Sequence, residues 1–181
     1  NVRTLSDFLL KFGTSVMKSV ASTPDDFARI VSTHLHDTHF VFDRVRFMTC
    51  GEGVSLNWEP DRNDITKMME LPLKLAHEKA LPYIVVLKEF QNLMNADEYE
   101  DVFKIMETQM KGRDRSNPHH ATYLMSGAMV NAMKFIFAET RYFYRLVNHV
   151  AFSPVDDKEI IEHIVKGFLN EMGKSFDKIG R

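Results

Sequence analysis

The feature that most constrains the fold is a short apolar run, Tyr-Ile-Val-Val-Leu, at residues 83–87. It follows Pro82 and ends abruptly at Lys88 and Glu89. A run this short, rich in β-branched residues and apolar at every position, predicts a strand that is covered on both faces, as in a parallel sheet. Ligands of parallel sheets bind at the carboxyl ends of the strands. We therefore expect Lys88, Glu89 and Gln91 to lie where a ligand would bind.

Helices are predicted on both sides of this strand along the chain, because apolar residues recur at helical spacing behind residues that cap helix starts. Pro72 lies inside the third predicted helix and is expected to kink or split it. A second core strand is predicted at Ala121–Ser126 and a short one at His149–Phe152, so the pattern favours an α/β layer architecture. The predicted helices run from Thr4 to about Ala21, from a Thr23 cap, from an Asp64 cap, over Ala96–Lys111, after Gly127, and from Asp156 to a cap at Gly173.

Residues 36–63 depart from the helical period. Phe40, Phe42, Val54 and Leu56 partly alternate around the glycine-containing segment 50–53. This pattern indicates either a strand pair with a glycine turn or an extended excursion. With this excursion included, residues 1–181 are expected to form a single domain.

Composition narrows the classes of function. A hydrophobic content of 44% and a charged content of 27% are those of an ordinary globular protein. A net charge of -2 provides no global attraction to nucleic acid or to an anionic membrane. Cys50 is the one cysteine, so no internal disulfide can form. Because the sequence contains neither a signal-like start nor an apolar run of about 18 residues, we expect a cytoplasmic location without membrane insertion.

The residues around the apolar run resemble a known family. Apolar residues followed by Lys88-Glu89-Phe90-Gln91 are similar to the Walker B strand of prokaryotic AAA+ ATPases of the STAND-like, archaeal-type group, which commonly reads apolar-Asp-Glu-Phe-Gln. The resemblance continues through residues 122–129, 131–137 and 143–145. It implies a three-layer, P-loop NTPase-like α/β sandwich with parallel core strands. The N-terminal strand and the phosphate loop of that fold would then be missing ahead of Asn1.

The resemblance implies roles for the matched residues. Glu89 matches the catalytic carboxylate that polarises water, and Gln91 would contact the nucleotide. Arg145 matches an arginine that stabilises phosphoryl charge, although stacking on the neighbouring aromatic rings is an equal alternative. The family has Gly-Ser where this chain has Gly127-Ala128, so Ser126 would have to supply the lost hydroxyl.

Lys88 is the main departure from the family pattern. The family uses ATP and Mg²⁺ and has a carboxylate associated with Mg²⁺ at this position. Two unit charges of like sign about 4 Å apart repel by roughly 4 kcal/mol at an effective dielectric near 20, and the double charge of the ion doubles this. We therefore expect weak Mg²⁺ coordination, with Lys88 touching phosphate or pairing with Glu89 instead.

Two other motifs are not interpreted as binding sites. The segment Gly167–Ser175 resembles a phosphate loop, but five residues separate its glycines and it ends a predicted helix rather than starting one. His34, His36 and His39 with Asp37 do not have the spacing of a zinc site, so no metal site is predicted.

Three hypotheses follow. The first is the ATPase core of a nucleotide-dependent STAND-like switch, active only in the full protein and acting with a protein partner or in a homo-oligomer. The second is a degenerate AAA+-like interaction domain without ATP hydrolysis, as Lys88 and Ala128 suggest. The third is an unrelated α/β domain whose likeness to Walker B is accidental.

Overall fold

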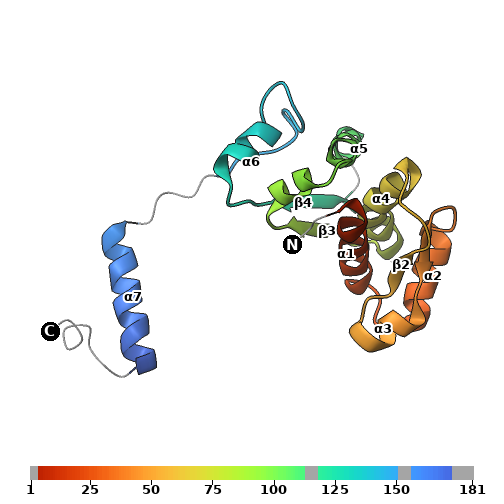
Figure 1. Ribbon diagram of the computed structural model, residues 1–181, viewed down its shortest axis with the longest axis horizontal. Helices are drawn as coiled ribbons and strands as arrows, with labels where there is room; N and C mark the ends of the chain where they lie inside the picture. Colours follow the sequence, from red (N-terminus) through yellow and green to blue (C-terminus); the bar gives the residue numbers. More distant parts are fainter. Residues whose placement is uncertain (1–3, 113–117, 151–155, 173–181) are drawn as a thin grey trace. The chain divides into compact units, whose positions relative to one another are not determined.

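The computed structural model describes residues 4–112, 118–150 and 156–172. The chain divides into two compact units, residues 1–147 and residues 148–181, and each is described by itself. The fold is mixed α/β with two small sheets (Figure 1). That confirms the α/β class, whereas the three-layer sandwich and the single domain remain predictions.

The first two helices begin where their capping residues predict. Helix α1 spans Leu5–Lys18, and the Thr4 side chain accepts a hydrogen bond from the Asp7 N–H. Helix α2 spans Pro24–His34 and starts with a complete capping box between Thr23 and Asp26. Both helices bury one apolar face, which the helical spacing of their apolar residues predicted.

Helix α4, Arg62–Lys79, differs from prediction in two respects. Its N-cap is Asp61, and Asp64 is the third helical residue, which completes a capping box with Asp61. Pro72 does not split the element in two, because the helix is continuous through it, and Pro72 is buried. Proline removes one backbone donor. The packing of α4 against α1, α5 and strand β3 compensates for that loss.

The ambiguous segment 36–63 forms a strand pair with a helix between its strands. Strands β1, Phe40–Phe42, and β2, Val54–Leu56, pair antiparallel. Helix α3, Arg44–Cys50, connects them and ends at Gly51, which has a left-handed φ of 72°. The strand pair, one of the two predicted alternatives, is present, but a helix that was not predicted connects the strands.

The central strand is confirmed, but its environment is not the predicted one. Strand β3, Tyr83–Leu87, pairs in parallel with β4, Ala121–Met125, in the register Tyr83↔Ala121 to Leu87↔Met125 (Figure 1). One face of this pair packs on α4, where the Tyr123 hydroxyl donates to the Met69 carbonyl at 3.4 Å. The other face is exposed, with Ile84 73% and Val86 50% accessible. The prediction that β3 is covered on both faces is therefore wrong for the described residues.

An aromatic cluster packs the chain that follows each strand. The 3₁₀ helix η1, Phe90–Asn95, follows β3, and α5, Tyr99–Lys111, comes next. Helix α6, Val130–Ile136, follows β4. The ring of Phe90 lies 5.0 Å from that of Phe103 and 6.0 Å from that of Phe143. These contacts fix η1 against α5 and the chain after α6.

In the second unit the structure describes one helix, α7, Asp157–Met172. Its start agrees with the predicted acidic first turn. The Gly173 cap lies outside the described residues, as does the second half of the strand predicted at 149–152. The described half, His149 and Val150, is not a strand, so that part of the prediction is wrong. None of the helices in the described ranges is both long and apolar enough to cross a bilayer.

Candidate functional site

A sharp turn at the carboxyl end of β3 leads the chain into η1. Glu89 adopts the left-handed conformation, with φ 52° and ψ 45°, and caps η1 without a side-chain hydrogen bond to its backbone. This conformation is uncommon for residues other than glycine and disfavoured by roughly 1–2 kcal/mol. Phe90 follows directly and is buried in the aromatic cluster, so the turn points Phe90 inward while Glu89 stays exposed.

Gln91 orients the carboxylate of Glu89. Its side chain is only 4% exposed, and its Nε2 donates to Glu89 Oε2 at 2.7 Å. The other amide atom, Oε1, is buried without a hydrogen-bond partner. A β-carbon built on Gly127 would overlap with this oxygen and lie 2.6 Å from Met133 Sδ. Gly127 is therefore required for the close approach of the chain after β4 to Gln91.

The parallel pairing brings the segments after β3 and β4 to one edge of the sheet. The Ser126 N–H donates to the Leu87 carbonyl at 3.0 Å, and the Phe90 N–H donates to the Ser126 carbonyl at 2.9 Å. Lys88, Glu89 and Ser126 are exposed at this edge. The structure thus gathers four of the five residues predicted from the sequence, namely Lys88, Glu89, Gln91 and Ser126.

Arg145, the fifth predicted site residue, does not follow a strand of this sheet. It belongs to the turn after α6, has a left-handed φ of 59°, and its guanidinium lies 5.0 Å from the centroid of the Tyr144 ring. The preceding Phe143 is fully buried in the aromatic cluster. Stacking on an aromatic ring, one of its two predicted roles, is present, and its catalytic role remains a prediction.

The polar groups at this edge fit a phosphate better than Mg²⁺. The Lys88 ammonium and the Ser126 hydroxyl can both donate to phosphate oxygens. A magnesium ion prefers several oxygen ligands around it, and here Lys88 directly precedes Glu89 in the chain.

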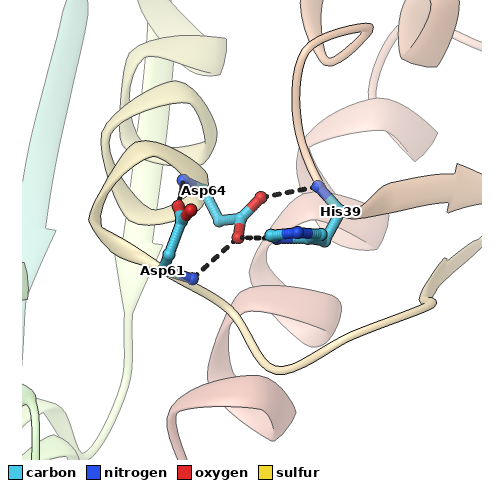
Figure 2. Close-up of side chains that lie close together, drawn as sticks. All are labelled: His39, Asp61 and Asp64. Carbon is cyan, nitrogen blue, oxygen red and sulfur yellow. Dashed lines mark hydrogen bonds and ion pairs between the residues drawn. The ribbon is translucent and has the colours of Figure 1, made fainter.

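A second polar cluster, at the start of α4, comprises His39, Asp61 and Asp64 (Figure 2). Asp64 is fully buried and accepts three hydrogen bonds. They come from the His39 N–H at 2.8 Å, from His39 Nδ1 at 2.8 Å and from the Asp61 N–H at 2.7 Å. The cluster joins the start of α4 to the residue before β1, so these hydrogen bonds already give its buried carboxylate a structural role.

The pKa values of His39 and Asp64 are shifted in opposite directions. The hydrogen bond to Asp64 raises the pKa of His39 above 6.5. Burial alone raises the pKa of Asp64, but hydrogen bonds from Asp61 and His39 outweigh burial, and the net pKa lies below 3.8. Both shifts favour the charged pair.

The histidines considered as one cluster in the sequence are separate in the structure. His34 Nε2 lies 2.9 Å from Glu78 Oε2, and Glu78 also accepts from Arg29 at 3.0 Å. Mainly because of His34, the pKa of Glu78 is lowered to about 2. The grouping of His39 with Asp61 and Asp64 was missed. The Asp-x-x-Asp spacing at 61–64 signals a capping box, whereas no local signal relates His39 to it.

No family model, curated protein or solved structure matches the sequence.

We predict that Gly127→Ala destabilises the protein by about 1–3 kcal/mol, because the new methyl group must displace Gln91 or Met133. The φ of Gly127 is not positive, so the expected effect is steric alone. Urea unfolding monitored by circular dichroism measures it. Gly112→Ala is the matched control, because its added β-carbon would lie 3.5 Å from the Thr108 carbonyl oxygen, which is an ordinary van der Waals contact. Equal stability of the two variants would contradict the close packing of Gly127.

We predict that the His39–Asp64 pair makes stability depend on pH. Because the pKa of His39 is raised in the folded state, its stabilisation is complete below about pH 6.5 and is lost as the pH rises through the raised value. Because the pKa of Asp64 is lowered, its stabilisation is present above about pH 3.8 and is lost as the pH falls through the lowered value.

Urea unfolding of the parent protein and of His39→Asn from about pH 6 to about pH 8 measures the first effect. Asparagine keeps a neutral donor for Asp64 but does not titrate. The loss of stability over this range should be smaller in the variant. Identical pH profiles would show that His39 does not carry the dependence.

Proposed function

We propose that this chain is the larger part of the ATPase core of a nucleotide-dependent switch of the STAND-like AAA+ group. The proposal is supported chiefly by one observation: parallel strands bring Glu89, with its carboxylate oriented by Gln91, to the same edge as Ser126. Carboxyl ends of parallel strands are where ligands of α/β sheets bind. In the proposed site Glu89 polarises the attacking water, and Lys88 and Ser126 contact phosphate oxygens.

The second candidate is a catalytically silent AAA+-like interaction domain. Two observations favour it. Lys88 places a cation beside Glu89, where the family pattern has a carboxylate. Ala128 offers no hydroxyl at the end of the turn after β4. Such a domain would keep the fold and bind a nucleotide weakly or not at all.

Substitution of Glu89 separates the two candidates. If the protein is an ATPase, Glu89→Gln should lower phosphate release by about 10²-fold or more, because general-base catalysis contributes at least this factor, while nucleotide binding is kept. Phosphate release and calorimetric titration with Mg-ATP, both on the full natural protein, measure the two quantities. Glu98→Gln is the matched control, since Glu98 is an exposed carboxylate whose side chain makes no capping hydrogen bond.

Each outcome assigns the function. Turnover in the parent and in Glu98→Gln but not in Glu89→Gln supports the switch. Nucleotide binding without turnover in the parent supports the silent domain. Full turnover in Glu89→Gln would remove Glu89 from the mechanism, and absence of nucleotide binding in the parent would end the ATPase proposal.

Lys88 should be the residue that weakens Mg²⁺ binding. We predict that Lys88→Asp strengthens the Mg²⁺-dependent part of nucleotide binding by about tenfold or more, because it replaces a repelling cation with a possible ligand. Lys88→Gln, which removes only the charge, should give an intermediate effect. Calorimetric titration of ATP with and without Mg²⁺ measures it. The same Mg²⁺ dependence in all three proteins would show that Lys88 does not face the ion.

A further inference from the structure

Strand β3 has an unpaired edge on the side opposite β4. The Tyr83 N–H donates to the His120 carbonyl at 2.9 Å, and the Leu87 carbonyl accepts from the Ser126 N–H. Residues that bond to one neighbour alternate along a strand with residues that face the opposite side. Ile84 and Val86 therefore direct their N–H and C=O groups away from β4, and within the described ranges β4 is the sole strand that pairs with β3.

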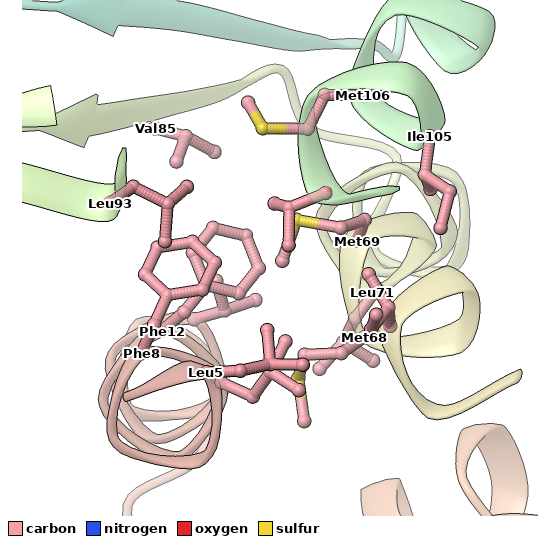
Figure 3. Close-up of a cluster of buried hydrophobic side chains, with 14 of the residues drawn as sticks. Leu5, Phe8, Phe12, Met68, Met69, Leu71, Val85, Leu93, Ile105 and Met106 are labelled. Carbon is pink, nitrogen blue, oxygen red and sulfur yellow. The ribbon is translucent and has the colours of Figure 1, made fainter. Parts of the chain in front are cut away.

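A groove runs along this edge, between β3 and α1. Phe8, Phe12 and Val16 line it from α1, residues 83–87 line it from β3, and its volume is about 310 Å³. Figure 3 shows Phe8 and Phe12 pointing toward Val85 and Leu93. At the amino end of β3, the Ser19 hydroxyl donates to the Tyr83 hydroxyl at 3.1 Å. The groove is thus mainly apolar, with unpaired backbone groups along one side.

The side chains beside this edge are unusually exposed for a parallel strand. Ile84 is 73% accessible, and Val86 is 50% accessible. Parallel strands are normally buried on both faces, and these two side chains belong to the uncovered face opposite α4. The unpaired backbone edge of an apolar strand is a separate feature, and it invites pairing with another chain. A helix lying in the groove would cover apolar surface but could not pair with the backbone groups of Ile84 and Val86. An extended segment would satisfy both.

The carboxyl end of β3 places one ammonium group and one carboxylate, those of Lys88 and Glu89, on the lining of this groove. Lys88 lines the groove, is exposed, and takes part in none of the ion pairs seen among the described residues. The nearest carboxylate in sequence, Glu89, already accepts from Gln91. A segment that carries a carboxylate where it reaches Lys88 would complement this charge.

We propose that the groove between α1 and β3 binds an extended segment of a partner polypeptide, which adds to the edge of β3 as a third strand. The segment is apolar at alternate residues, where it faces Phe8, Phe12 and Val16, and it is acidic where it passes Lys88. Main-chain hydrogen bonds to Ile84 and Val86 supply affinity, and the apolar wall and Lys88 supply selectivity. This proposal does not rest on nucleotide binding.

The test uses the full chain and a peptide of alternating valine and threonine with glutamate at both ends, so that either orientation places a carboxylate near Lys88. Fluorescence anisotropy of the labelled peptide measures affinity, and amide hydrogen exchange followed by NMR locates the contact. We expect saturable binding with new protection at the Ile84 and Val86 amides. Methylation of the peptide nitrogens that face the edge should weaken binding about tenfold or more, because at least two backbone hydrogen bonds are lost.

Two matched controls make the result specific. The same peptide methylated at the alternate nitrogens, which face away from the edge, should bind as the parent peptide does. A peptide ending in lysine instead of glutamate should bind weakly to the parent protein and better to Lys88→Glu, which reverses the charge.

Several outcomes would overturn the proposal. They are no binding of the parent peptide, equal loss of affinity with either methylation pattern, and new protection that leaves out the Ile84 and Val86 amides. Another such outcome would be seen without peptide. Protection of the Ile84 and Val86 amides from exchange would rise with protein concentration, and sedimentation velocity would detect dimers. That result would assign the edge to a second copy of the chain.

Discussion

The parallel register of β3 and β4 is the constraint on which the arrangement of the first unit depends. It pairs Val85 with Tyr123, so both side chains face the helical layer that includes α4. A shift by one residue would turn the buried Val85 toward solvent and bring the exposed Ile84 to the core face, since side chains alternate along a strand. The same register ends both strands at one edge, where Glu89 and Ser126 follow. Burial of the core and assembly of the candidate site therefore have a common cause.

Phe90 holds the conformation of the turn at that edge. A left-handed Glu89 is disfavoured by roughly 1–2 kcal/mol, while full burial of a phenylalanine side chain contributes roughly 1.5–3 kcal/mol. The Phe90 ring packs against Phe103 and Phe143, so burial can offset the cost of the turn. The residue after Phe90, Gln91, fits closely against Gly127. The position of the Glu89 carboxylate is thus determined by the packing of the two residues that follow it and by the hydrogen bond from Gln91.

The groups along the length of β3 differ from the groups at its carboxyl end. Ile84 and Val86 present apolar side chains and unpaired backbone groups, whereas the carboxyl end presents Lys88 and Glu89. Lys88 and Glu89 also line the groove beside α1. A strand added to β3 would therefore end next to the proposed catalytic carboxylate. The two proposals meet at these residues, yet one depends on backbone pairing and the other on nucleotide chemistry.

Features that depend on neighbours in the sequence could be predicted. The starts of α1 and α2 follow from Thr4 and from the Thr23 capping box, and β3 follows from five consecutive apolar residues. Caps and periodicity act within a few residues, so the sequence contains the whole signal. The expectation that Lys88, Glu89, Gln91 and Ser126 lie near one another needed only that β3 and β4 pair in parallel.

The sequence by itself therefore determined the main elements and the polar residues that follow the central strands. Tertiary structure decided that α4 continues through Pro72, that Asp64 binds His39, and that one face of β3 stays exposed. It also decided that Gln91 lies against Gly127. The course of α4 through Pro72, the His39–Asp64 hydrogen bond and the fit of Gln91 against Gly127 depend on contacts between residues distant in the chain, whose energies outweigh local preference. The exposure of one face of β3 depends on whether another element packs there. The spacing of nearby residues reveals neither.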